Sequence, residues 1–312
     1  MITIRRHPLK FYFTLAFSSL FFFGIPILLF FLASNFGEEE DGTAIIVLLL
    51  IALLLVMLGI YMLNIYLKNA PSIQIGNGHI SFGKESYPLE DITEVKLEGK
   101  AAFPFFIHYP MEAASLTFKD SSVKHIFVDL YSNAWELKSY LEAVVINKGS
   151  YQPAIKSGTK QEVNIQGVVQ AYKKPQLLSM RGLSVWGLGV YLVFRMGLLE
   201  NPSTTAITIA AVVFLLWFTI GSWLMHFPSL SSNYLIIKNQ NFFWVKDAYK
   251  LDHIREVVFE TQSRMPNCIR VISTDHRNKL YPAATLWDKN WWEFEEALEK
   301  KGIKVRNECV PH

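Results

Sequence analysis

Four apolar stretches stand out along the chain, at residues 11–34, 43–67, 182–199 and 203–225. Three of them contain no charged side chain, and the other is interrupted only by Arg195 near its end. Each is about as long as the roughly 20 residues that a helix needs to cross the hydrocarbon core of a bilayer. Backbone groups without hydrogen-bond partners are costly in lipid, so each stretch is predicted to be a transmembrane helix. The spacing groups these helices into two hairpins.

The region after each hairpin alternates apolar and polar positions with a period of two, which favours half-buried strands. In the first region, residues 72–83 form two short alternating runs around Asn77-Gly78, a pair typical of a tight hairpin turn. Residues 132–146 change to a helical spacing of apolar positions. Between them, further strands are expected at residues 85–89, 93–97, 114–118 and 123–128. The pattern predicts antiparallel strands closed by one C-terminal helix.

The two β-rich regions contain an internal repeat. Residues 87–98 read YPLEDITEVKLE and residues 249–260 read YKLDHIREVVFE, so six of twelve positions are identical at an offset of 162. The same ungapped register aligns Asn77 with Asn239. Matches in the same order in both halves indicate a duplicated unit of one hairpin and one β-domain.

A second match near the end of each copy supports the repeat and sets its limits. WELKSYLE from Trp135 corresponds to WEFEEALE from Trp292, which predicts a second C-terminal helix at about residues 288–301. The expected boundaries are 1–70 for the first hairpin, 71–148 for the first β-domain, 149–181 for a polar linker, 182–227 for the second hairpin and 228–308 for the second β-domain.

This arrangement resembles the bacterial pleckstrin-homology-like (PH-like) membrane proteins. The resemblance rests on two strand–turn–strand stretches, from Ile73 to Ile92 and from Leu235 to Ile254. It implies a fold class of membrane helices plus soluble, mainly-β domains: four transmembrane helices in two hairpins, and two small PH-like antiparallel barrels or sandwiches, each closed by a C-terminal helix. It also implies a multi-pass protein of the bacterial cytoplasmic (inner) membrane.

The placement of charge predicts the orientation. Arg5 and Arg6 precede the first helix and Lys173 and Lys174 precede the third, whereas the first hairpin loop is acidic at residues 38–41. Lys and Arg favour the cytoplasmic side of a membrane. Both termini and both β-domains are therefore expected to be cytoplasmic.

Composition adds little chemistry to this picture. The chain is 51% hydrophobic and 18% charged, as for a protein that is part membrane and part soluble, and its net charge of +3 gives no nucleic-acid footprint. Cys268 and Cys309 lack metal-ligand spacing and are predicted to be free thiols. His125 and Asp129 fit ordinary polar positions of a sheet. No catalytic, metal or cofactor site is expected.

Arg195 and Asn64 lie inside the predicted spans and are the candidate intramembrane polar sites. Arg195 is ionisable, which makes it a functional candidate, but it lies near the predicted outer end where it could reach water or pair with Glu200. Asn64 is near the inner end of the second span and fits a surface contact.

An aromatic stretch distinguishes the first copy from the second, which lacks about seven residues there. It occupies residues 101–110 and contains two prolines, Pro104 and Pro110, which disfavour a central strand. Leaving its large side chains in water would be unfavourable, at roughly 1.5–3 kcal/mol for each phenylalanine. Two interpretations stay open: the stretch covers an open end of the barrel, or it contacts the membrane interface or a protein partner. The candidate contact residues are Phe103, Phe105, Phe106, Ile107 and Tyr109.

The features together predict a non-enzymatic, membrane-anchored scaffold or protein-interaction protein, as an accessory subunit of a membrane complex. The expected partners are the lipid bilayer and a protein, with a second copy of the chain as a further candidate. One alternative is a small transporter or lipid-handling protein that uses the four-helix bundle. A second alternative is an enzyme whose site the sequence does not reveal.

Overall fold

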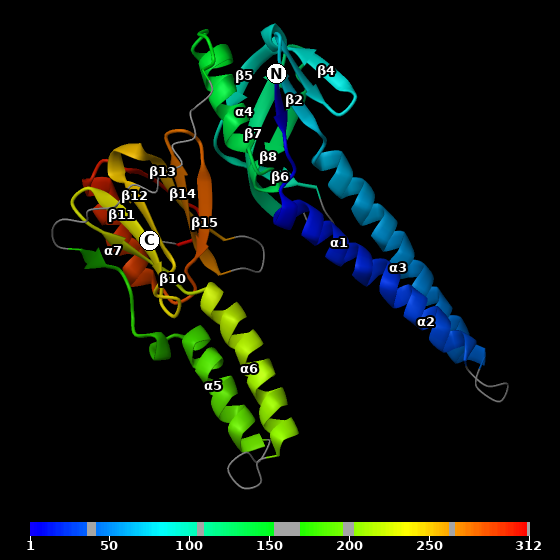
Figure 1. Ribbon diagram of the computed structural model, residues 1–312. Coiled ribbons are helices and arrows are strands. Elements are labelled where there is room, and N and C mark those ends of the chain that lie inside the picture. Colours follow the sequence, from blue (N-terminus) through cyan, green and yellow to red (C-terminus); the bar gives the residue numbers. More distant parts are fainter. Residues whose placement is uncertain (36–41, 105–108, 153–168, 196–202, 262–265, 311–312) are drawn as a thin grey trace. The chain divides into compact units, whose positions relative to one another are not determined.

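The computed structural model describes the whole chain except residues 36–41, 105–108, 153–168, 196–202, 262–265 and 311–312. The chain divides into two compact units, Met1–Ile155 and Lys156–His312. Each unit combines a pair of neighbouring helices with a β-domain (Figure 1). The structure therefore has membrane-compatible helices together with several small antiparallel sheets, as the hydropathy pattern predicts.

The first unit has two long apolar helices that pack against each other. One runs over Pro8–Ser34 and the other, α3, over Gly42–Asn69, with mean hydropathies of 2.4 and 3.2. The first helix alternates between π-helical and α-helical segments: η1 (Pro8–Phe13), α1 (Thr14–Ser19), η2 (Leu20–Gly24) and α2 (Ile25–Ser34). Most of their side chains are exposed and apolar, which suits a lipid environment.

The β-domain of the first unit contains two sheets. The first has the order β1-β2-β3-β4, all antiparallel neighbours: β1 (Ile2–Ile4), β2 (Ile73–Gly76), β3 (His79–Phe82) and β4 (Glu85–Pro88). A 3-10 turn leads into the second sheet, in which β7 pairs with all three other strands: β5 (Ile92–Lys96), β6 (Lys100–Phe103), β7 (Tyr109–Phe118) and β8 (Val123–Phe127). The domain ends in helix α4 (Ala134–Leu141) and its π-helical continuation η5 (Glu142–Ile146).

The membrane hairpin is inserted between two neighbouring strands of one sheet. Strand β1 precedes the hairpin and β2 follows it, yet they pair directly, with Ile4 opposite Ile73. The side chain of Asn133 holds β1 in place: it accepts a hydrogen bond from the backbone of Arg5 at 2.7 Å and donates one to Thr3 O at 3.2 Å. Strand β1, which lies within the predicted hairpin region 1–70, thus belongs to a sheet together with strands that follow the hairpin.

The second unit repeats this order of elements. Strand β9 (Gln170–Ala171) precedes helices α5 (Met180–Arg195) and α6 (Thr204–Trp223), and β10 (His226–Leu230) follows them. Strands β11 (Tyr234–Asn239) and β12 (Lys246–Lys250) complete a sheet of order β12-β11-β10-β9. Residues 170–171, assigned above to a linker, thus belong to a sheet. The second sheet contains β13 (Ile254–Thr261), β14 (Asn267–Ser273), β15 (Asn278–Pro282) and, after helix α7 (Asp288–Lys300), β16 (Lys304–Asn307).

Three of the described helices are long and apolar enough to span a membrane: Pro8–Ser34, Gly42–Asn69 and Thr204–Trp223. Helix α5 has 16 described residues, and the remainder of its predicted span falls among residues 196–202, outside the described part of the chain. Three candidate spans are therefore supported, where four were predicted.

The ungapped alignment of the two copies fails before Tyr87 and Tyr249. Asn77 lies in the turn between β2 and β3, whereas Asn239 ends β11, one strand later in the order of elements. The alignment slips because residues 240–245 make a longer connection than the β3–β4 turn. Downstream the prediction holds better, since Trp135 and Trp292 both lie on the helix that follows the last antiparallel strand.

Candidate functional site

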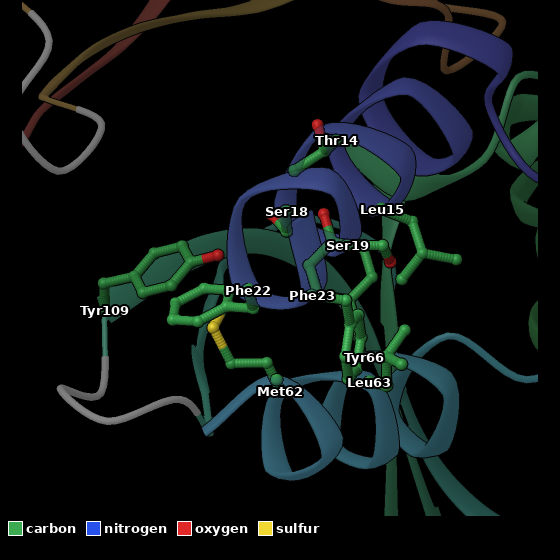
Figure 2. Close-up of a pocket in the computed structure, with 11 residues that line it drawn as sticks. Thr14, Leu15, Ser18, Ser19, Phe22, Phe23, Met62, Leu63, Tyr66 and Tyr109 are labelled. Atoms are coloured by element: carbon green, nitrogen blue, oxygen red, sulfur yellow. The ribbon is translucent and has the colours of Figure 1, made fainter. Parts of the chain in front are cut away.

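A cavity of about 170 Å³ lies where the first hairpin meets its β-domain (Figure 2). The N-terminal helix and α3 form most of its wall, and Tyr109, the first residue of β7, closes it from the β-domain. Figure 2 shows Tyr109 reaching toward the helix that bears Ser18 and Phe22. The lining residues are Thr14, Leu15, Ser18, Ser19, Phe22, Phe23, Gly59, Met62, Leu63, Tyr66 and Tyr109.

Local irregularity of the helix accompanies the cavity. Phe22 and Phe23 belong to the π-helical segment η2, and single π-helical turns are frequent at functional sites. On the facing helix, Gly59 allows close approach, because a Cβ there would lie 2.9 Å from the Cβ of Phe22. The two helices are thus tightly packed at Gly59, beside the space that the cavity occupies.

The chemistry of the cavity is mixed. Thr14, Ser18 and Ser19 bring hydroxyl groups, while aromatic and aliphatic side chains supply the rest of the wall. An apolar cavity of about 150 Å³ in another protein can hold benzene, so this one has room for a small apolar or amphipathic group. Burial raises the pKa of the Tyr109 hydroxyl, which keeps that group neutral and able to donate a hydrogen bond.

The structure describes part of the predicted aromatic contact stretch. Phe103 is fully buried and packs against Tyr66, Tyr109 and Phe127, at ring-centroid distances of 5.7, 5.5 and 4.9 Å. Phe103 belongs to the core of the first unit. Phe105, Phe106 and Ile107 lie outside the described residues.

Pro110 lies within a strand, β7, although the sequence disfavours a central strand there. It lies opposite Ala102 of β6, in the part of β7 that has no second described neighbour. A proline is tolerated there because the ladder does not need its missing N–H on the open side.

The other predicted residues do not converge on the cavity. Arg195 is the last described residue of α5 and is exposed, and Asn64 is exposed on α3. Asp129 is not placed for acid–base work with His125, because its carboxylate binds Lys10 Nζ at 2.6 Å and so ties the N-terminal helix to the β-domain. His125 instead contacts Ser115 Oγ at 2.9 Å.

A second candidate site is the edge of the second sheet in each unit. In the second unit β16 covers this edge by pairing in parallel with β13, with Lys304 opposite Glu256. The Glu256 carboxylate accepts Lys304 Nζ at 2.9 Å and two nitrogens of Arg306 at 2.9 and 3.0 Å. Its side chain is only 3% exposed, so the basic strand and the glutamate are held tightly together.

In the first unit the corresponding edge is open within the described residues. Strand β5 pairs with β7 on one side, and no described strand pairs with its other side. Glu94, which the ungapped sequence alignment pairs with Glu256, has a side chain that is 55% exposed and contacts Lys96 of its own strand at 3.3 Å. Edge strands present unpaired backbone donors and acceptors, so β5 is a template for a further strand.

Comparison with known proteins adds no relative: no family model, curated protein or solved structure matches the chain. Cys268 and Cys309 do not form a disulfide. Across the described ranges, no group of three or more His, Cys, Asp or Glu side chains could hold a metal ion.

Sequence reasoning missed both sites. The cavity depends on how two apolar helices pack, and this leaves no motif. The sequence does carry a signal for the edge, because the ungapped alignment pairs Glu94 with Glu256. The role of these glutamates cannot be inferred without β16, a four-residue strand far along the chain.

Proposed function

We propose that this chain is a non-enzymatic, membrane-anchored scaffold made of a duplicated unit. Each unit would contain two transmembrane helices and a PH-like β-domain, with four spans in all and both domains in the bacterial cytoplasm. The shared order of strands, 3-10 turn, second sheet and helix supports the duplication. Arg5-Arg6 after β1 and Lys173-Lys174 after β9 lie at the same point of each unit and support the orientation.

The observation that best supports a binding role is the open edge of β5. In the second unit, the same edge is filled by a strand whose Lys304 and Arg306 neutralise Glu256. Since Glu94 presents the same carboxylate without such a strand among the described residues, the fitting partner is an extended polypeptide with basic residues at alternate positions. Strand addition of this kind obtains affinity from main-chain hydrogen bonds and specificity from side chains.

A peptide that copies residues 302–310, with serine in place of Cys309, is the natural probe. The full chain in lipid nanodiscs should bind the labelled peptide, measured by fluorescence anisotropy. Glu94→Lys should weaken binding at least about tenfold, because it replaces attraction by repulsion and each 1.4 kcal/mol is a factor of ten in affinity. Glu90→Lys changes a neighbouring exposed glutamate outside β5 and should leave binding unchanged.

Two results would contradict this proposal. Equal binding by the wild type and Glu94→Lys would show that the peptide does not use the β5 edge. A dimer that Glu94→Lys converts to a monomer, without peptide binding by the monomer, would assign the edge to a second copy of the chain.

The cavity favours lipid handling as a second candidate function. Its apolar wall, with the hydroxyl groups of serine, threonine and tyrosine side chains, fits one segment of a lipid molecule better than it fits an ion. Ser18→Phe would fill the cavity and should reduce the amount of lipid that co-purifies with the chain in detergent, measured by mass spectrometry. Unchanged lipid content would remove this candidate.

A further inference from the structure

The connection between β11 and β12 carries three consecutive aromatic residues, Phe242, Phe243 and Trp244, which we call the aromatic tip. Phe243 is 83% exposed and Trp244 is 67% exposed, so this connection presents two large apolar side chains to the surroundings. The corresponding β3–β4 turn of the first unit consists of Gly83 and Lys84. Single exposed apolar residues are common on proteins, but a fixed run of aromatics needs an explanation.

The aromatic tip is attached to a candidate membrane helix. The Phe242 ring meets the ring of Phe218 on α6 edge-on, at a centroid distance of 6.2 Å. Asn241 Nδ2 donates to Ser222 Oγ at 2.6 Å, and Asn239 Nδ2 donates to Ser222 O at 2.7 Å. These contacts hold the tip beside the last turns of α6 rather than letting it point freely into solvent.

The contact with Phe218 fixes the depth of the aromatic tip. Phe218 lies five residues before Trp223, the end of α6, which corresponds to roughly 7.5 Å along the helix axis. A side chain that packs at this level next to a membrane-spanning helix lies beside its apolar surface. Phe243 and Trp244 are therefore at the height where a bilayer surrounding α6 would begin.

Other residues at this end of the second unit have the same character. Trp223 is 58% exposed at the end of α6, and Trp287 is 45% exposed with Lys174 Nζ at 5.2 Å from its ring centroid. Tryptophan, with lysine beside it, is enriched where a protein passes from hydrocarbon to headgroups. The aromatic tip is thus part of a wider group of interfacial side chains.

We propose that the aromatic tip inserts into the headgroup–acyl boundary of the bilayer that α6 crosses, and so fixes the second β-domain against the lipid surface. The partner is the bilayer itself. This contact is independent of the strand-binding role proposed for β5, which lies in the other unit. It gives the second β-domain a third attachment to the membrane beyond its two chain connections to α5 and α6.

Spin labels can measure the depth of the aromatic tip directly. In a Cys268→Ala, Cys309→Ser background, a nitroxide is attached at Trp244→Cys of the full chain in nanodiscs of phosphatidylcholine and phosphatidylglycerol. Ser232→Cys, an exposed position in the turn at the opposite end of β11, is the matched control. Collision with oxygen reports lipid, and collision with a water-soluble nickel chelate reports water.

The label at residue 244 should collide several-fold more with oxygen relative to the nickel chelate than the label at residue 232. Equal ratios at the two positions would overturn the proposal, because the aromatic tip would then be in water. Protection of residue 244 from both reagents would overturn it as well, since it would assign the tip to a protein contact. Adding Phe243→Ser should lower the oxygen ratio at residue 244 by weakening the insertion.

Discussion

The two units have a similar order of helices and strands, but different side-chain contacts stabilise them. In both units a short strand and a pair of basic residues precede two apolar helices. The short strand then pairs with the first strand that follows the helices, so both belong to one sheet. Two glutamates aligned at the offset of 162 differ in their partners: Glu98 binds Lys138 of α4 at 2.5 Å, whereas Glu260 binds Arg270 of the adjacent strand at 2.7 Å. The first pair ties helix to sheet and the second ties strand to strand. A carboxylate at the aligned position thus does not by itself determine which element it stabilises.

The edges of the second sheets differ more. The second unit buries Glu256, Val257 and Val258 under its own strand β16, whereas Glu94 and Lys96 of β5 are exposed in the first. Among the described residues, the second β-domain covers this edge with its own strand and the first does not. This difference is the basis of the binding role proposed for β5.

The largest effect is expected from the fully buried pair of the second unit. Arg270→Met leaves the Glu260 charge without its cation in a site where both side chains are 0% exposed. Removing one partner of such a pair should lower the free energy of unfolding of the second β-domain by about 3–5 kcal/mol. Hydrogen exchange of peptides from β13 and β14 measures this loss. Arg270→Met with Glu260→Gln should recover part of it, and no recovery would show that the charge is not the cause.

Charge reversal at the aligned edge positions tests the comparison most directly. Glu256→Lys would repel Lys304 and Arg306 and should cost about 2–3 kcal/mol, with faster hydrogen exchange of β16. Glu94→Lys changes an exposed side chain and should alter the free energy of unfolding of its own domain by less than about 0.5 kcal/mol. A similar decrease in the free energy of unfolding for both variants would mean that the β5 edge is also covered and that the two edges do not differ.

A pH dependence is also expected around β10 of the second unit. Burial, and secondarily the charge of Lys279, lowers the pKa of His226 below 6.5, against the opposing effects of its bond to Pro282 O and of Asp247. The unfolded chain then binds a proton more readily than the folded one. Stability should be constant above pH 6.5 and should fall as the pH drops below it, by at most about 1.4 kcal/mol per pH unit.

Exchange of peptides around β10, followed from pH 7.5 to 5.5, measures this slope. His226→Asn keeps a donor for Pro282 O but does not titrate, so its slope should be flatter than that of the wild type. An unchanged slope would assign the dependence to another group.

Much of the architecture is encoded locally and could be predicted. Hydropathy alone places the spans at Gly42–Asn69 and Thr204–Trp223 to within a few residues, because lipid requires a continuous apolar surface. The Asn77-Gly78 turn follows from the positive φ angles that these two residues adopt, 52° and 78°. The C-terminal helices follow from the spacing of their apolar residues.

The missed elements are those whose partners are distant. Strands β1, β9 and β16 have three, two and four residues, too few for an alternating pattern to show. Their pairing is stabilised by contacts made far along the chain, such as those of Asn133 with β1. The cavity and the aromatic tip were missed for the same reason, since packing against a neighbouring helix creates both.

The insertion of each hairpin between paired strands has a consequence for synthesis. Ile4 must pair with Ile73, and Gln170 must pair with Leu230. The first strand of each pair is therefore synthesised well before the second. Closing such a loop in a flexible chain carries an entropic penalty that grows with its length. Two antiparallel helices in a bilayer bring together the two ends that are connected to the strands, so the membrane itself would align the strands. Each β-domain should therefore assemble only after its hairpin has been inserted, which makes the lipid a folding template and not only an anchor.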